Sequence, residues 1–259
     1  MISHLPTPSD QSELALSIPD LKGPSIGLLG GSFNPIHCGH IQLAMTAALA
    51  IDRLDLVPCG LPPHKSKAEL LPFSLRLELV ALAVADFDKS DRRICVNDLE
   101  GSRPGPSYTI DTLTSYRAAE PKAALFFFLG ASDLFTLTQW RSGLILPRLA
   151  TFVAVSRQDI GAWHIAAFVA ACWPKAVPLS LTSPPMSPFN SCGWYLPPTE
   201  ELPAAELLFL PLASLNCSSS KVREAWRTGQ DFASFLHPTV TRRLLQRRTE
   251  VEAFWGPRP

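Results

Sequence analysis

Two histidines near the start of the chain have the type and spacing that could bind a phosphate group. His37 and His40 lie three residues apart in the segment 26–41, which reads IGLLGGSFNPIHCGHI. At the start of a helix, side chains three apart share one face, and the free backbone N–H groups there favour anions. The sequence therefore predicts a phosphate site in which two imidazoles add side-chain donors to backbone donors.

The loop before these histidines is suited to close contact with a ligand. Gly30 and Gly31 permit close backbone approach, and Pro35 stiffens the turn. The segment matches neither the GxGxxG fingerprint nor the GxxxxGK[ST] loop, so hydride transfer and P-loop chemistry lose support. Two alternatives stay open. The histidines could be ordinary helix-cap residues, or they could share a metal, although no third ligand is obvious nearby.

A second candidate for a phosphate site lies far along the chain, in the segment 217–223, CSSSKVR. Ser218–Ser220 can cap the helix that follows, and Lys221 and Arg223 add positive charge. Serine donors, a helix start and a guanidinium together would form a second cradle for phosphate. The alternative is a plain helix cap with surface bases.

Both segments must be positioned by the elements around them, and these alternate between strand and helix. Short apolar runs end at glycine or proline, and Ala- and Leu-rich segments follow them. This alternation predicts βαβ units and a parallel sheet. The expected strands are 26–29, 54–58, 94–96, 124–129, 151–155 and 207–210, and the expected helices are 39–51, 73–87, 109–118 (with Thr109 as its N-cap) and 240–248.

The chain is expected to form one domain with appendages. We expect a flexible N-terminal tail over 1–24, the domain over 25–248 and a C-terminal tail over 249–259. Within the domain, residues 158–206 contain eight prolines, which exclude long helices and central strands. We therefore interpret this segment as an irregular insertion that keeps a helix at about 163–171.

Composition narrows the class of protein. The chain has 259 residues, of which 46% are hydrophobic and 18% charged, so it can bury a large core. Acidic and basic residues both number 23, which does not favour nucleic acid as a partner. No apolar run is long enough to span a membrane, and the first residues lack the pattern of a secretory signal, so we expect a cytoplasmic protein. The six cysteines form no CxxC pair and are expected to be free thiols; a homo-oligomer stays open.

Taken together, five segments are similar to a known family. GGSFNPIHCGH resembles the GGTFDPxHxGH motif of the nucleotidylyltransferase superfamily, and SSSKVR resembles its ISSTxIR motif. VPCGLPPHK (57–65), RPGPSYTIDTL (103–113) and FFLGASDLFTLTQW (127–140) look like segments of bacterial nicotinate-nucleotide adenylyltransferases. The resemblance covers about 25–157 and 207–247.

The resemblance implies a Rossmann-like, doubly wound parallel sheet and a specific reaction. The family transfers the AMP of ATP to nicotinate mononucleotide, releasing pyrophosphate and forming deamido-NAD, with Mg²⁺ as cofactor. The phosphate of the acceptor is the nucleophile, so catalysis depends on positioning and charge stabilisation. Nicotinamide mononucleotide or phosphopantetheine as the acceptor, and a nucleotide-binding module without turnover, are the alternatives.

The resemblance also assigns roles to individual residues. For two of them another interpretation stays open: Lys65, assigned to ATP, could be an exposed loop residue, and Trp140, assigned to the acceptor, could belong to the core. The assigned residues are His37, His40 and Arg223 for catalysis; Gly30, Gly31, Ser32, Phe33, Gly39, Lys65, Gly130, Ser219 and Ser220 for ATP; and Tyr108, Thr109, Trp140 and Asp133 for the acceptor.

The chain departs from the family pattern at several of these places. Asn34 stands where the bacterial motif usually has Asp, and Cys217 replaces an apolar Ile. Ser132 occupies the position of the family's acid, and Asp133 follows one residue late. Either the loop shifts to bring Asp133 into the site, or a contact with the ribose is lost.

Overall fold

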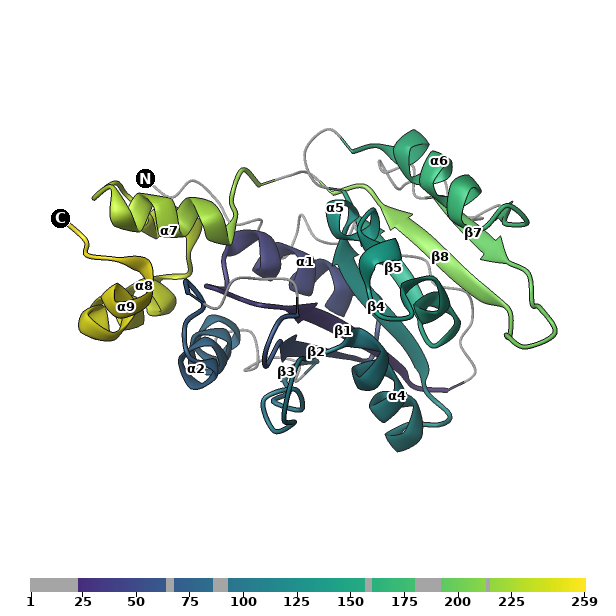
Figure 1. Cartoon of the computed structure of the whole chain (residues 1–259), viewed down its shortest axis with the longest axis horizontal. Helices are drawn as coiled ribbons and strands as arrows, with labels where there is room; N and C mark the ends of the chain where they lie inside the picture. Colours follow the sequence, from purple (N-terminus) through teal and green to yellow (C-terminus); the bar gives the residue numbers. More distant parts are fainter. Residues whose placement is uncertain (1–22, 64–67, 86–92, 157–159, 180–191, 213–214) are drawn as a thin grey trace.

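The described residues of the protein form one eight-stranded sheet, seen in a computed structural model (Figure 1). The structure describes residues 23–63, 68–85, 93–156, 160–179, 192–212 and 215–259. The strands are β1 (Ser25–Gly31), β2 (Arg53–Pro58), β3 (Ile94–Val96), β4 (Ala124–Gly130), β5 (Thr151–Val155), β6 (Val177–Leu179), β7 (Cys192–Leu196) and β8 (Ala205–Leu210). Across the sheet they lie in the order β3-β2-β1-β4-β5-β8-β7-β6.

Helices cover both faces of this sheet (Figure 1). The α-helices are α1 (Cys38–Ala48), α2 (Phe73–Val84), α4 (Thr109–Ala119), α5 (Ala131–Leu134), α6 (Ala162–Cys172), α7 (Ser219–Arg227), α8 (Pro238–Gln246) and α9 (Arg248–Trp255). Short 3₁₀ helices are η2 (Leu137–Gln139), η3 (Gly143–Arg148) and η4 (Ala233–Phe235).

The parallel part of the sheet confirms the doubly wound fold. Strands β3, β2, β1, β4, β5 and β8 all pair in parallel with their neighbours. The chain order reverses at β1, which pairs with β2 on one side and with β4 on the other. Ligands of such sheets bind outside the carboxyl ends of the strands at this reversal. A site is therefore expected beside Gly31 and Gly130, where β1 and β4 end.

Strand β4 is buried on both faces, as its continuous apolar sequence predicts. Phe126 and Phe128 belong to a core cluster with residues of α1, α2, α7, α8 and α9. Leu125 and Phe127 belong to a second cluster, which contains residues of α4 and α6. The alternation of side chains along one strand thus ties the two helical layers to the same sheet.

The expected insertion is more ordered than its proline content indicates. Helix α6 confirms the helical segment, but β6 and β7 lie inside the region interpreted as irregular, and that interpretation is wrong for both. Strand β7 pairs antiparallel with β8, and β6 pairs antiparallel with β7. These two antiparallel pairings make the sheet mixed. The strands can form despite the many prolines because β7 contains none, and because Pro178 lies in the edge strand β6, where a missing N–H donor is tolerated.

The end of the chain also differs from the expectation of a tail. Residues 248–255 form α9, in which Val251 is fully buried and Trp255 is 2% exposed. Both side chains belong to the core cluster that contains α7 and α8. Apolar residues at helical spacing in this short segment carry the signal, which the surrounding charged residues obscure.

The remaining elements lie close to their predicted ranges. All six expected strands and four expected helices are present, with ends that shift by a few residues. Tyr108, and not Thr109, is the N-cap of α4. The expected N-terminal tail lies almost wholly outside the described residues. In the described part of the chain, no helix has the length and apolar character needed to cross a membrane.

Candidate active site

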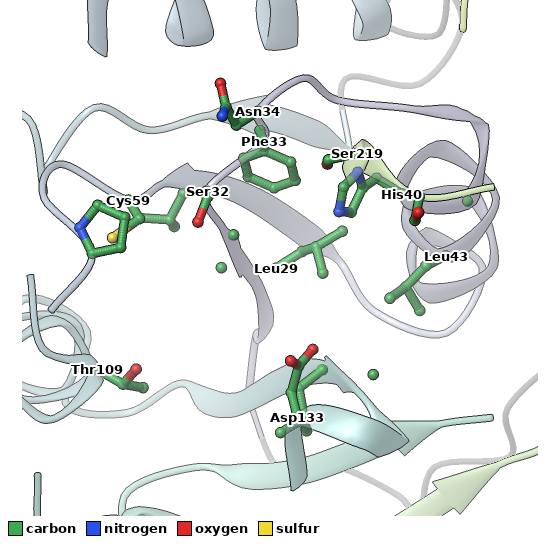
Figure 2. A pocket seen from close by; sticks show the side chains of 18 of the residues that line it. Leu29, Ser32, Phe33, Asn34, His40, Leu43, Cys59, Thr109, Asp133 and Ser219 are labelled. Carbon is green, nitrogen blue, oxygen red and sulfur yellow. The ribbon is translucent and has the colours of Figure 1, made fainter. Parts of the chain in front are cut away.

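A cavity of about 690 Å³ opens at the carboxyl ends of β1 and β4 (Figure 2). Its wall combines the loop after β1 with the starts of α1, α4, α5 and α7. Lys65 lies outside the described residues. All the other site residues predicted from the sequence line this one cavity: Gly30, Gly31, Ser32, Phe33, His37, Gly39, His40, Tyr108, Thr109, Gly130, Asp133, Trp140, Ser219, Ser220 and Arg223.

The loop after β1 has an unusual backbone that presents an aromatic ring to the site. Phe33 has a φ of 44°, in the left-handed region that costs a non-glycine residue about 1–3 kcal/mol. Its ring is buried and meets the His40 ring edge-on, with 4.9 Å between the ring centroids. A Cβ on Gly31 would lie only 3.2 Å from the Phe33 ring, so this fold of the loop favours glycine at position 31.

The two histidines begin α1 and hold each other in place. His37 is the N-cap, and its Nδ1 accepts the backbone N–H of Gly39 at 3.2 Å. The Nδ1 of His40 accepts the backbone N–H of His37 at 3.3 Å, and the rings pack with centroids 3.8 Å apart. Because Nδ1 of each ring is an acceptor, the neutral form carries its proton on Nε2, which can donate to a phosphate oxygen.

The start of α1 also contacts the second predicted cradle directly. The Sγ of Cys217 accepts the backbone N–H of Gly39 at 3.1 Å and lies 3.5 Å from Nδ1 of His37. Ser219 donates its hydroxyl to the carbonyl of Pro35 at 2.9 Å. These contacts join segments about 180 residues apart in the sequence. The two cradles inferred separately from the sequence are therefore parts of one site.

Arg223 projects from α7 and is oriented by groups on two other segments. Its Nη1 donates to the carbonyl of Asn34 at 2.9 Å, and its Nε donates to Oε2 of Glu69 at 3.2 Å. Glu69 also pairs with Arg227 through Oε1 at 2.6 Å. This hydrogen bond, together with the charge of Arg223, holds the pKa of the Glu69 carboxyl below its ordinary value. Glu69 therefore stays ionised at neutral pH and keeps the guanidinium of Arg223 at the cavity wall.

Asn34 and Trp255 hold the backbone of Glu69. Asn34 donates through Nδ2 to the carbonyl of Glu69 at 2.7 Å and accepts the N–H of Leu71 through Oδ1 at 3.0 Å. An ionised Asp at position 34 could accept but not donate, so the amide matches both partners. The carbonyl of Glu69 also accepts the indole N–H of Trp255 at 3.1 Å, which connects the last helix to the site.

A buried arginine that the sequence analysis missed connects the loops behind the cavity. Arg76, on α2, is 1% exposed, and burial lowers its pKa. Its guanidinium donates to four carbonyl oxygens, those of Ser32, Cys59, Gly60 and Leu71, at 2.7–3.0 Å. The loops after β1 and β2 and the start of α2 are thus held together at one cation.

Polar side chains are also buried at the far end of the cavity, near the start of α4. Thr112 donates to Oε1 of Glu100 at 2.6 Å, and both residues line the cavity. The hydroxyl of Ser107 accepts the N–H groups of Gly60 and Leu61 at 3.1 and 3.2 Å. Burial, followed by the charge of Glu100, raises the pKa of Cys59 to about 12, so this thiol stays protonated.

Asp133, and not Ser132, lies at the cavity. Figure 2 shows its carboxylate pointing from α5 into the pocket, opposite His40. The first turn of α5 therefore brings Asp133 to the site, in agreement with the loop-shift alternative.

Trp140 and its neighbour Arg141 form the outer edge at this end. The indole N–H of Trp140 donates to the hydroxyl of Thr136 at 3.0 Å, and Trp140 lines the cavity, although it also packs against the second core cluster. Arg141 follows it, with its guanidinium 4.9 Å from the centroid of the Tyr108 ring. The sequence does not predict Arg141, Glu69 or Glu100 as site residues, because a lone charged residue in a loop forms no pattern.

The donor set of the cavity also decides what kind of metal would fit it. Within the described residues, no group of three or more His, Cys, Asp or Glu is arranged to hold a metal ion. The carboxylates of the wall are those of Glu69, Glu100 and Asp133, and Glu69 is engaged by two arginines. Mg²⁺ commonly binds through substrate phosphates, waters and one or two carboxylates. The cavity therefore fits a divalent ion that enters with a triphosphate.

Comparison with known proteins agrees with this geometry. The family model described as cytidylyltransferase-like matches residues 28–225. A protein of Maridesulfovibrio salexigens, described as "Probable nicotinate-nucleotide adenylyltransferase", is 31% identical over 232 residues, which cover 89% of this chain and 99% of the relative. A protein of Thermus thermophilus with the same description is 46% identical over 134 residues, covering 51% of this chain and 69% of the relative.

Solved structures show the same fold. The Plasmodium falciparum nicotinic acid mononucleotide adenylyltransferase complexed with NaAD aligns with a TM-score of 0.65 at 19% identity, covering 88% of this chain and 98% of that one. The family match extends from β1 to α7 and so includes both segments predicted to bind phosphate. The chain therefore belongs to the cytidylyltransferase-like family and, within it, to the nicotinate-nucleotide adenylyltransferases.

Proposed function

We propose that this protein transfers the AMP moiety of ATP to nicotinate mononucleotide, forming deamido-NAD and pyrophosphate in NAD biosynthesis. The observation that carries the proposal is the meeting of the two predicted phosphate cradles at one cavity, through the contact of Cys217 with Gly39. The similarity to curated nicotinate-nucleotide adenylyltransferases supports the choice of acceptor.

In this mechanism the triphosphate of ATP lies against the starts of α1 and α7. The Nε2–H of His40 and the guanidinium of Arg223 donate to phosphate oxygens, with Ser219 and Ser220 beside them. His37 is 1% exposed, and its main role is to orient the N-terminus of α1 and the ring of His40. These donors are fixed by the fold before ATP binds, so they stabilise developing negative charge with little reorganisation.

The chain needs no nucleophile of its own. An oxygen of the acceptor's phosphate attacks the α-phosphorus of ATP, a P–O bond forms, and the bond to the leaving pyrophosphate breaks. The pair of electrons of that bond stays on pyrophosphate, whose charge His40 and Arg223 offset. Rate enhancement then comes from holding the two phosphates in line and from charge stabilisation.

Other residues hold the rest of the two substrates. Gly30, Gly31 and Phe33 would contact the nucleotide, and Asp133 would accept a hydrogen bond from a ribose hydroxyl. Trp140 and Tyr108 would contact the pyridine ring at the far end. Mg²⁺ entering with ATP would offset the charge of the leaving pyrophosphate.

The proposal is tested by pyrophosphate release from ATP, Mg²⁺ and nicotinate mononucleotide, with nicotinamide mononucleotide and phosphopantetheine as competing acceptors. We expect the highest kcat/KM with nicotinate mononucleotide. A higher kcat/KM with nicotinamide mononucleotide or phosphopantetheine would make that compound the acceptor. ATP binding by calorimetry without any product would indicate a nucleotide-binding module without turnover.

The role of His40 has a matched control in the same chain. His164 occupies the same position in α6, where its Nδ1 accepts the backbone N–H of the N-cap Gly161 at 3.1 Å, but it does not line the cavity. His40→Ala should lower kcat at least about 100-fold, whereas His164→Ala should leave it within about twofold. Equal losses in both variants would reduce His40 to a helix cap.

A further inference from the structure

We infer that the side chain of Arg141 selects an acceptor whose pyridine ring carries a negative charge, nicotinate over nicotinamide. This inference rests on the proposed function and names the residue that determines its specificity. It starts from the position of the guanidinium, which lies at the mouth of the cavity beside the start of α4.

The position of Arg141 is set by two neighbours. The guanidinium carbon lies 4.9 Å from the centroid of the Tyr108 ring, and Nη1 lies 3.8 Å from Oδ2 of Asp111. The side chain is 60% exposed, so it keeps most of its hydration when no acceptor is bound. Stacking on an aromatic face suits Arg better than Lys, because the guanidinium is planar. The contact therefore restrains the charge near the cavity without burying it.

The reaction itself determines which part of the acceptor reaches Arg141. The acceptor's phosphate must lie next to the α-phosphorus of ATP, and the triphosphate lies at the end of the cavity that contains His40 and Arg223. Figure 2 shows Thr109, at the start of α4, on the far side of the pocket from His40 and Ser219. The pyridine ring, which is the opposite end of the acceptor, must therefore point toward α4 and Arg141.

The charges of the wall explain why this cation affects specificity. Among the described residues that line the cavity, the arginines are Arg141 and Arg223, and Arg223 is held at the other end. The acids on the wall are Glu69, Glu100 and Asp133, and none of these carboxylates attracts an anionic ring substituent. Arg141 thus supplies attraction that a carboxylate gains and a neutral carboxamide does not. Because the side chain is largely exposed and Asp111 offsets part of its charge, we expect an effect of about tenfold.

The test compares acceptors in variants of the full chain. Arg141→Gln should lower kcat/KM for nicotinate mononucleotide about tenfold through KM, with nicotinamide mononucleotide changed less than twofold. Arg141→Lys should recover part of the discrimination, and added salt should narrow the difference between wild type and Arg141→Gln. Arg242→Gln, an exposed arginine of α8 away from the cavity, is the matched control and should change neither acceptor.

The outcomes separate this inference from the proposed function. Equal losses for both acceptors in Arg141→Gln, or an unchanged ratio of their kcat/KM values, would overturn the role of Arg141 while leaving adenylyl transfer intact. No turnover of any pyridine mononucleotide by the wild-type protein would overturn the proposed function, and this inference with it. An unchanged KM for ATP and an unchanged melting temperature in Arg141→Gln would support a local effect on the acceptor.

Discussion

Replacing Arg76 by Met should destabilise the protein more than any surface substitution. Met has a similar length but no donors, so four carbonyl oxygens, of which the Leu71 oxygen is buried and three are partly buried, lose the guanidinium that they now contact at 2.7–3.0 Å. A buried acceptor left without a donor costs about 1–3 kcal/mol. The low end applies because three of the four oxygens belong to partly buried residues, and it gives a loss of about 4 kcal/mol for the four contacts together.

Urea unfolding measures this loss directly. Arg242→Met, on the exposed surface of α8, is the control and should change the free energy of unfolding by less than about 0.5 kcal/mol. Arg76→Lys should lie between wild type and Arg76→Met, because an ammonium has three donors and cannot reach all four oxygens. A loss below about 1 kcal/mol in Arg76→Met would show that the four contacts do not hold the loops together, and the reasoning would fail.

Three further predictions concern residues of the cavity wall. The lowered pKa of Glu69 means that its contribution to stability is present above its ordinary pKa of 4.5 and is lost as the pH falls through the folded value, so the difference in unfolding free energy between wild type and Glu69→Gln should shrink on acidification; a constant difference would contradict this. Gly39→Ala would place a Cβ 3.1 Å from Sγ of Cys217 and from the His37 ring, so kcat should fall at least about tenfold. Adding Cys217→Ala should restore part of kcat, because it removes one of the two contacts. Strictly additive effects of the two substitutions on kcat would argue against a steric cause. Because the pKa of Cys59 is about 12, iodoacetamide near pH 8 should leave this thiol unmodified in the folded protein and modify it after unfolding. Peptide mapping measures the modification, and rapid labelling of Cys59 in the folded protein would contradict its burial.

Much of the fold could be predicted because its signals are local. The apolar run of β4 and the two glycines that end β1 predict a buried strand and a turn from a few residues each. The two phosphate cradles could be predicted for the same reason, since a helix start with serines or histidines forms a pattern in one short segment. That Cys217 touches Gly39 depends on the packing of the whole chain and could be inferred only through the family resemblance.

The features that escaped prediction depend on distant partners. Arg76 reads as one polar residue of an amphipathic helix, and its carbonyl partners come from three separate loops. Strands β6 and β7 are short and flanked by prolines, so their structure depends on pairing with the edge of β8. Helix α9 likewise shows its role only in the buried contacts of Val251 and Trp255.

The hydrogen bond from Trp255 to the carbonyl of Glu69 has a consequence for the time course of protein synthesis. A ribosome makes the chain from the N-terminus, and domains begin to fold as they emerge. The histidines of α1 are made early, but the support of Glu69, and through it the orientation of Arg223, depends on Trp255, which is made after all eight strands. A nascent chain can therefore contain every strand of the sheet before it contains all the residues that orient Arg223.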